Sequence, residues 1–428
     1  MHRMGGVPPN PIIHPASFVA QPILAVRLGG LPFQLSPVNS RLPHGRILPD
    51  MNHPRNFRVY FLLAALALGG LTLLLREHRP SFLRPGLRLY AYVTTADGSV
   101  TVVDLVKLKA FSHFYLGPGL SGLREHPTRS EIFGVSSAGG YVWILDPRIN
   151  QVTARIPVGP LPYAIEFSRD GKWLYTTTSG NDSLLALDAQ SHAILARAAT
   201  GHEPVLARVT PDGKSILVVN RRDGSLGIHD AGTLAQRTAV TVVPQPEDVA
   251  ILPDSSVAFV LSRSERRISV VDLRRGVLLG NLELAGKPTD MLLKPDGGEL
   301  YVISPEAHGL QAINTWTHEV GDYMVLGSAP TRGVLSSDAS LLYVSDTAAG
   351  RVTPVDIYNR RIIREAGKGF PVPAGDSPSA LRFDPEENLL LVVSQGSGDL
   401  AVIRVRTNFL VTMIPVGEHP QELAVKLF

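Results

Sequence analysis

The chain has 428 residues and no cysteine, and its 41 Lys and Arg against 38 Asp and Glu give a formal net charge of +3. The lack of cysteine excludes disulfides, thiolate metal sites and a lipoprotein anchor. Hydrophobic residues make up 44% and charged residues 18% of the chain. This composition supplies a large core and argues against disorder over most of the length.

The positive charge is concentrated at the N-terminal end. Residues 1–88 contain ten arginines and two acidic residues, a net charge of +8, which leaves about −5 for residues 89–428. A protein that holds nucleic-acid phosphates needs a basic face on its folded part. We therefore expect no nucleic-acid partner.

Residues 1–57 are predicted to be a disordered, proline-rich tail. Residues 1–50 contain nine prolines, no acidic residue before Asp50, and neither a strand nor a helix period. Met51 opens a short basic stretch, MNHPRNFR, and resembles a natural start. We interpret residues 1–50 as a candidate over-extension of the reading frame, which N-terminal sequencing would decide.

An apolar run follows the tail. The 17 uncharged residues from Val59 to Leu75 lie between Arg58 and Arg76, and as a helix they would span roughly 26 Å. Such a run is either a membrane anchor or the core of a signal peptide. Because no small-x-small cleavage pattern follows it, we predict a transmembrane signal-anchor helix at 58–76 and a linker at 77–88. The flanking arginines do not decide its orientation.

The remainder of the chain is a repeat. A polar residue closes a β-rich run in each copy, and six of the seven intervals are 42 residues while the last is 48. A corner residue, proline in all but the first copy, keeps the same step. The closing residues are Asp104, Asp146, Asp188, Asp230, Asp272, Asn314, Asp356 and Arg404, and the corner residues are Leu120, Pro162, Pro204, Pro246, Pro288, Pro330, Pro378 and Pro420.

Each copy has the pattern of four short strands. YAIEFS, KWLYTTT, SLLALD and AILARAATG are separated by turn residues such as Asp-Gly and Gly-Asn-Asp, which tolerate the backbone angles of tight reversals. Four strands per unit of about 40 residues are typical of a propeller blade. We therefore predict an all-β fold over 89–428, a β-propeller of eight four-stranded blades, with seven blades as the alternative; a β-sandwich would not require so constant a period.

The two ends of the repeat complement each other. The first copy, near Tyr92, has its outer three strands but no inner strand, and the tail QELAVKLF is an inner strand without outer ones. We predict that the C-terminal strand completes the first blade and closes the ring. Tyr92, Tyr175, Tyr301 and Tyr343 recur at the repeat step and are expected in the core.

Several of these segments resemble the YVTN-type β-propeller repeat family. YVTTADGSVTVVD, LYVSDTAAGRVTPVD and IPVG are similar to its units over residues 89–428, whereas Arg404, Val243 and FDPEEN depart from the pattern. The resemblance implies a propeller, often with seven blades, located in the periplasm or outside the cell. Most members of the family have no assigned reaction.

Position in the ring indicates a candidate site. The second residue after each corner residue is expected to face the central channel, because the third and fifth residues after the corner are apolar in almost every copy and point to the other face of the inner strand. Asp248, Asp290 and Arg332 fall on consecutive blades and are predicted to cluster at one arc of the channel mouth. The full series is Gly122, Ala164, Leu206, Asp248, Asp290, Arg332, Ala380 and Glu422.

The corners add further polar side chains to this predicted mouth. They could form a solvated rim that satisfies loop amides, a ligand or ion site, or a catalytic site. His202 and His419 have similar surroundings but lie three blades apart, so they are not expected to share a metal. We expect no cofactor. The polar side chains near the corners are His202, Glu203, Glu247, Lys287, Asp376, Glu418 and His419.

The favoured function is a membrane-anchored, extracytoplasmic scaffold that binds other proteins or a small ligand at the funnel. One alternative is a hydrolase resembling the lactonase propellers, with Asp248 or Asp290 as base and Arg332 holding the substrate. Another is a haem binder resembling the propeller of bacterial nitrite reductase, with a rim histidine as axial ligand. Neither G-x-S-x-G nor H-E-x-x-H occurs, and fold alone does not choose among these functions.

Overall fold

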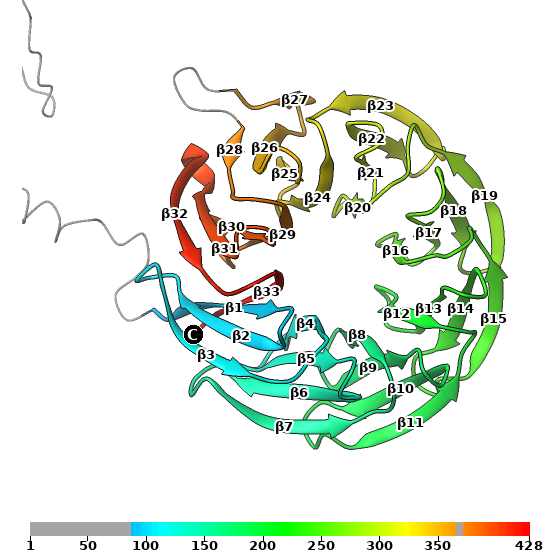
Figure 1. Ribbon diagram of the computed structural model, residues 1–428. Coiled ribbons are helices and arrows are strands. Elements are labelled where there is room, and N and C mark those ends of the chain that lie inside the picture. Colours follow the sequence, from blue (N-terminus) through cyan, green and yellow to red (C-terminus); the bar gives the residue numbers. More distant parts are fainter. Residues whose placement is uncertain (1–86, 365–370) are drawn as a thin grey trace, which may run out of the picture. The chain divides into compact units, whose positions relative to one another are not determined.

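The computed structural model describes residues 87–364 and 371–428. Their strands form eight sheets arranged around a common centre (Figure 1), which confirms the eight-bladed propeller and excludes the seven-bladed alternative. The predicted tail at 1–57, the predicted transmembrane helix at 58–76 and the linker up to residue 86 lie outside the described residues. Across 87–364 and 371–428, no helix combines the length and apolar character needed to cross a bilayer.

The first four blades, each given from the centre outward, begin with the one that joins both ends of the repeat. Blade 1 consists of β33 (Pro420–Leu427), β1 (Leu89–Thr95), β2 (Ser99–Asp104) and β3 (Lys109–Tyr115). Blade 2 consists of β4 (Leu120–Glu125), β5 (Ile132–Ser136), β6 (Tyr141–Asp146) and β7 (Gln151–Pro157). Blade 3 consists of β8 (Pro162–Phe167), β9 (Trp173–Thr178), β10 (Ser183–Asp188) and β11 (Ile194–Ala199). Blade 4 consists of β12 (Pro204–Val209), β13 (Ser215–Asn220), β14 (Ser225–Asp230) and β15 (Gln236–Thr241).

The other four blades follow in chain order. Blade 5 consists of β16 (Asp248–Ile251), β17 (Val257–Leu261), β18 (Arg267–Asp272) and β19 (Val277–Glu283). Blade 6 consists of β20 (Asp290–Leu293), β21 (Glu299–Ser304), β22 (Gly309–Asn314) and β23 (Glu319–Val325). Blade 7 consists of β24 (Pro330–Leu335), β25 (Leu341–Asp346), β26 (Arg351–Asp356) and the short β27 (Arg361–Ile362) and β28 (Val372–Pro373). Blade 8 consists of β29 (Pro378–Phe383), β30 (Leu389–Ser394), β31 (Asp399–Arg404) and β32 (Phe409–Pro415).

The ring is closed as the sequence predicted. β33 pairs antiparallel with β1 in a register that runs from Leu89 opposite Leu427 to Thr95 opposite Pro420. β33 is therefore the innermost strand of blade 1, and it covers the edge of β1 that would otherwise be unpaired. All other blades are formed from consecutive strands.

The core lies between the blades. Eight clusters of buried apolar side chains are formed, seven of them from two neighbouring blades. The eighth combines blades 4 and 5 with Ala164 of blade 3. Between blades 1 and 2, for example, Tyr92 and Val102 pack with Leu123 and Trp143, all at most 1% exposed. Both faces of every sheet are thus covered. This explains why the second and third strands have nearly continuous apolar sequences rather than alternating ones.

The recurring polar residue at the end of the third strand is explained by a turn. The Asp104 carboxylate accepts hydrogen bonds from the N–H groups of Val106 and Lys107, at 3.0 and 2.9 Å. Equivalent bonds occur at Asp188, Asp230, Asp272 and Asn314. The carboxylate or amide oxygen thus accepts hydrogen bonds from turn N–H groups that have no partner on a neighbouring strand. Where arginine takes this place, in blade 8, the turn is instead a 3-10 helix, Val405–Thr407.

The periodic tyrosines are buried, as predicted, and three of them also join neighbouring blades. The hydroxyl of Tyr92 in blade 1 donates to Asn150 Oδ1 of blade 2 at 2.6 Å. Tyr175 of blade 3 donates to the carbonyl of Ala231 in blade 4 at 3.2 Å, and Tyr343 of blade 7 donates to Asn408 of blade 8. Each of these three tyrosines therefore combines apolar packing of its ring with a hydrogen bond from its hydroxyl group.

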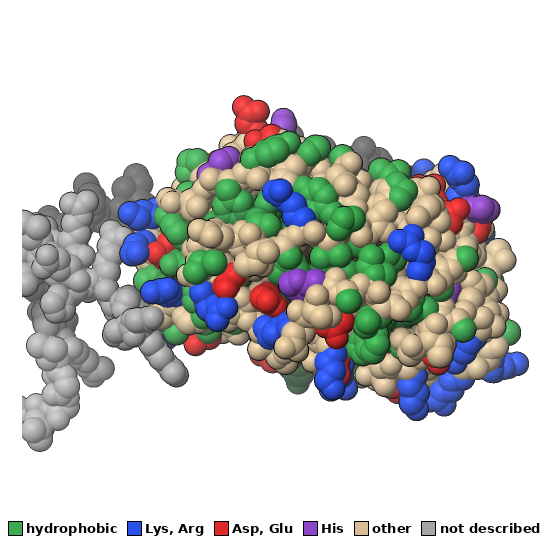
Figure 2. All heavy atoms as spheres, turned by 90° about the horizontal axis from the view of Figure 1, so that it is seen from below, with side chains coloured by type: hydrophobic (Ala, Val, Ile, Leu, Met, Phe, Trp, Pro, Cys, Tyr) green, Lys and Arg blue, Asp and Glu red, His purple; other side chains and the backbone are tan. Residues whose placement is uncertain are grey.

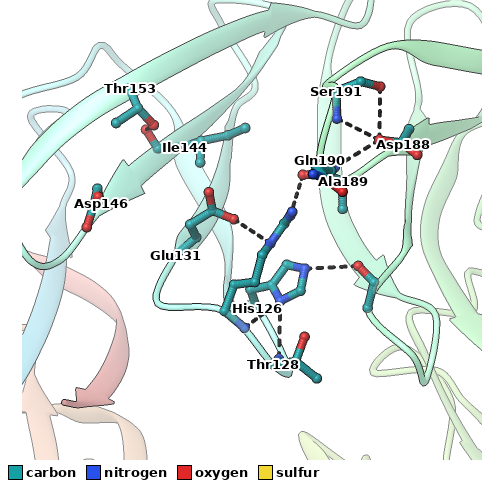
Figure 3. A network of polar contacts seen from close by, with 12 residues as sticks. His126, Thr128, Glu131, Ile144, Asp146, Thr153, Asp188, Ala189, Gln190 and Ser191 are labelled. Atoms are coloured by element: carbon teal, nitrogen blue, oxygen red, sulfur yellow. Dashed lines mark hydrogen bonds and ion pairs between the residues drawn. The ribbon is translucent and has the colours of Figure 1, made fainter.

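A buried histidine organises the junction of blades 2 and 3 on the face opposite the corners (Figure 3). His126 Nδ1 accepts from the N–H groups of Thr128 and Arg129, so the ring proton lies on Nε2, which donates to the carbonyl of Gly171 at 2.9 Å. Burial, reinforced by the charge of Arg129, lowers the pKa of His126 to about 4. The imidazole is neutral at pH 7 and serves as a structural turn residue.

The outer wall of the ring carries charges of both signs. On the side drawn in Figure 2, Lys and Arg side chains are mixed with Asp and Glu, and apolar side chains lie between them. Exposed apolar residues of the outermost strands include Phe111, Ile194 and Tyr323, at 45%, 42% and 43% exposure. The outermost strands therefore expose apolar side chains as well as charged ones.

Candidate functional site at the channel mouth

The eight innermost strands surround the centre of the ring (Figure 1). Each of them starts directly after a corner that joins it to the outermost strand of the preceding blade. All corners therefore lie on one face, and the first residues of the inner strands form the mouth of the channel on that face. Residues further along each strand lie deeper, by about 3.3 Å per residue.

Asp290 and Arg332 meet at this mouth. Arg332 Nη1 lies 3.6 Å from Asp290 Oδ1 and donates to the carbonyl of Thr289 at 3.2 Å. Asp290 Oδ2 accepts from the N–H of Gly333 at 2.9 Å, across the blade boundary. Its side chain is only 13% exposed. The sequence placed this pair on neighbouring blades, and the structure brings the two side chains into contact.

Asp290 is electrostatically unusual. Burial raises its pKa to about 6, and the charge of Asp248 on the next inner strand acts in the same direction. The charge of Arg332 and the hydrogen bonds from Gly333 and Met291 oppose this shift. A carboxyl group that titrates near pH 6 in a channel mouth is a candidate proton-transfer group.

A chain of ion pairs continues from this pair around the mouth. Arg221 Nη1 lies 3.2 Å from Glu203, and its Nη2 lies 3.9 Å from Glu247. Arg263 Nη1 lies 2.7 Å from the other oxygen of Glu247, and Arg263 Nε donates to the carbonyl of Thr289 at 3.2 Å. The set spans blades 4 to 7. We call it the mouth arc, and it consists of Glu203, Arg221, Glu247, Arg263, Thr289, Asp290 and Arg332.

The mouth arc ends on an exposed aromatic side chain. Arg221 lies over the ring of Tyr163, 5.8 Å from its centroid, and Tyr163 is 47% exposed. Leu161, in the same corner, is 54% exposed. Tyrosine and arginine are among the residue types enriched at the hot spots of protein interfaces.

Two other predicted residues of the corners, His202 and Lys287, form hydrogen bonds with carboxylates of neighbouring loops. His202 Nδ1 lies 2.7 Å from Asp182, whose other oxygen accepts from the N–H of Glu203 at 2.8 Å. The N–H of Lys287 donates to Glu306 at 2.8 Å. Carboxylates of the second-to-third strand loops thus satisfy corner amides, as the solvated-rim interpretation predicted. The side chains of His202 and Lys287 are exposed and are not part of the mouth arc.

The remaining predicted residues lie on the other side of the mouth. Asp376, Glu418 and His419 are exposed, and their side chains have no hydrogen-bond or ion-pair partner within the part of the chain that the structure describes. Glu422 reaches from β33 to blade 2, where its carboxylate accepts from the N–H groups of Gly122 and Leu123 at 3.3 and 2.8 Å. It connects two blades there. Any role of these four residues in binding stays a prediction.

The predicted exposure of the second residue after the corner was wrong for blades 2 to 4. Gly122 is buried, and Ala164 and Leu206 are 8% exposed. These residues are small or apolar, and they pack between the inner strands. In blade 3 the exposed side chain at this end of the strand is Tyr163.

Sequence reasoning missed four charged side chains deeper in the channel. Arg208 on β12 bridges two neighbouring blades, with Nη1 3.2 Å from Glu166 and Nη2 3.7 Å from Asp248. Alternation carried two residues further along each inner strand would have found this second ring. Its charged members are Arg124, Glu166, Arg208 and Arg382.

The described residues contain no group of three or more His, Asp or Glu side chains placed to hold a metal ion. None of the eight innermost strands contains histidine. His202 and His419 lie on corners that lead into blades 4 and 1. The mouth arc and Tyr163 therefore supply guanidinium, carboxylate and phenol groups for binding, and no imidazole.

Comparison with known proteins supports the fold. No family model and no curated protein matches the sequence, so the YVTN likeness stays a resemblance. Among solved structures, the dihydro-heme d1 dehydrogenase NirN in complex with DHE is similar with a TM-score of 0.65 and 18% identity, over 81% of this chain and 77% of the other.

Two further structures are similar at low identity. Hydrazine synthase from Kuenenia stuttgartiensis has a TM-score of 0.53 and 20% identity, over 67% of this chain and 96% of the other. A functionally unknown protein from Desulfotomaculum acetoxidans DSM 771 has a TM-score of 0.56 and 13% identity, over 78% and 98%. At these identities the likeness is one of fold.

Proposed function

We propose that this protein is a binding scaffold whose partner, a protein or peptide segment, docks on the mouth arc and the exposed side chains of Leu161 and Tyr163. The supporting observation is the contact of Tyr163 with Arg221. Arg221 is itself held in place by its ion pairs with Glu203 and Glu247. Side chains already ordered by such pairs lose little entropy on binding. The mixed charges of the arc would set the orientation of the partner.

The proposal includes a membrane tether. The apolar segment at 58–76 would anchor the chain, and the propeller would lie in the periplasm or outside the cell. This part rests on the sequence pattern of that segment and on the resemblance to the YVTN-type repeats. A tethered propeller would meet partners at a raised effective concentration near the membrane.

A pull-down with the full chain tests the docking surface. We expect a specific partner to be captured by the wild type and lost in Tyr163→Ala and Arg263→Ala, because truncating an interface tyrosine or arginine costs about 2 kcal/mol or more, roughly thirtyfold in affinity. Tyr358→Ala is the matched control, because Tyr358 is 90% exposed and lies in a turn on the opposite face. Equal capture by all variants, or capture of nothing by the wild type, would contradict the proposal.

A lactonase-like hydrolase is a second candidate, favoured by the raised pKa of Asp290 beside Arg332. A general base must be deprotonated, so kcat/KM for a lactone would rise as the pH increases through about 6. We expect Asp290→Asn to lower kcat/KM about 100-fold or more and Arg332→Ala to raise KM. Asp170→Asn, on the opposite face, is the control. The absence of turnover across a panel of sugar and aliphatic lactones would exclude this candidate.

We do not put forward haem binding. The likeness to the haem-related dehydrogenase is one of fold, at 18% identity. The predicted axial ligands were the rim histidines, of which His202 is held by Asp182 outside the mouth arc. Absorbance of the purified protein above 400 nm is a simple check of this choice.

A further inference from the structure

Arg124 occupies a distinctive place inside the channel. It lies on β4, four residues after the corner position of blade 2, and therefore deeper than the mouth arc. Its guanidinium has five N–H donors, of which Nη1 donates to the carbonyl of Leu123 at 2.9 Å. Over residues 87–364 and 371–428, no other acceptor and no carboxylate within 4.0 Å pairs with it. Arg124 is half-buried, so part of the residue is in contact with solvent.

The nearby carboxylates are already engaged. Glu166 pairs with Arg208, and Glu422 accepts two backbone N–H groups of β4. Glu125 accepts from the N–H of Val425 at 2.7 Å and pairs with Arg382. Arg124 therefore has acidic neighbours at a distance, and each of them is directed to a different donor.

The surroundings of Arg124 also contain other cations. Burial lowers its pKa, and the charges of Arg208 and Arg382 act in the same direction against Glu166 and Glu422. An arginine stays protonated in proteins. The cost of burying the Arg124 charge, and its repulsion by the neighbouring arginines, therefore remain uncompensated. A bound anion would relieve both the lost hydration and the repulsion between guanidinium groups.

We propose that Arg124 is the centre of an anion site inside the channel, which takes a carboxylate or phosphate group of a small ligand. The planar guanidinium matches two oxygens of either group in a bidentate geometry. Arg208 and Arg382 contribute the surrounding positive potential, while their own donors stay on Glu166 and Glu125. The site lies deeper in the channel than the mouth arc, on blade 2, and does not depend on the partner proposed there.

Isothermal titration calorimetry on the full chain tests this site with inorganic phosphate and, separately, acetate at constant ionic strength. We expect at least one of the two anions to bind with one-to-one stoichiometry. Arg124→Gln should weaken that binding at least about tenfold, and Arg124→Lys, which keeps the charge but not the fork, should weaken it less. Binding of phosphate alone would identify a phosphate ester as the ligand class, and binding of acetate alone a carboxylate.

Arg275→Gln is the matched control, because Arg275 is exposed in a turn of blade 5 and forms no ion pair with any described residue. The unfolding midpoint of Arg124→Gln in the absence of both anions should be no lower than that of the wild type, because the substitution removes an uncompensated charge. This measurement also shows that the variant folds. The proposal is overturned if neither anion binds the wild type, or if both variants bind as tightly as the wild type.

Discussion

Deleting residues 419–428 is expected to lower the free energy of unfolding by about 5 kcal/mol or more, because it removes β33 from the ring. Leu423, Ala424 and Val425 are at most 6% exposed, and burying a leucine or valine side chain contributes about 1.5–3 kcal/mol each. The ladder with β1 would be lost as well. Such a loss is comparable to the whole stability of many domains.

Chemical denaturation of the full chain and of the deletion variant measures this effect. The control removes ten residues from the N-terminus instead, residues 1–10, which lie outside the described strands. A synthetic peptide of residues 419–428, added to the deletion variant, should restore part of the stability by pairing with β1. Equal unfolding midpoints for the two deletions would refute the role of β33 as the closing strand.

Arg208→Gln is expected to lower the free energy of unfolding by about 2 kcal/mol. The substitution leaves the carboxylates of Glu166 and Asp248 without their guanidinium partner, and they would repel each other and Asp290. Breaking a fully buried pair costs 3–5 kcal/mol. The expected loss is smaller here because the side chains are 21–29% exposed and water screens them.

A double-mutant cycle distinguishes this interaction from a general effect of the substitution. Glu166→Gln combined with Arg208→Gln should cost less than the sum of the two single variants, by about 1 kcal/mol. Arg169→Gln is the control: it removes an exposed arginine just after β8 and should change stability by less than about 0.5 kcal/mol. Strict additivity of the two single effects would show that the guanidinium and the carboxylate do not interact.

The candidate site was only partly predictable. Asp290 and Arg332 were placed together because the repeat step puts equivalent positions on neighbouring blades, and the structure brings them to 3.6 Å. Arg221 and Arg263, which connect them to Glu203 and Glu247, were missed. Both lie in loops after the second strand, where no periodicity restricts the residue type or the direction of the side chain.

The charged ring around Arg124 and Arg208 was missed for a different reason. The alternation that predicted Asp248 continues to these positions, so the sequence did contain a signal. What it did not contain was the pairing, because Glu125 contacts Val425 and Arg382 from 300 and 257 residues away along the chain. Such contacts follow from closing the ring, and a local pattern does not encode them.

The sequence by itself determined the repeat period, the four strands of each blade, and the use of the C-terminal strand to complete the first blade, and it favoured eight blades over seven. These features follow from local order: an extended chain with a constant repeat converts each period into the same strands and turns, and asparagine, aspartate and glycine fix the reversals. Only the tertiary structure decided which charges meet. The packing of one blade on the next sets the distances on which electrostatic interactions depend.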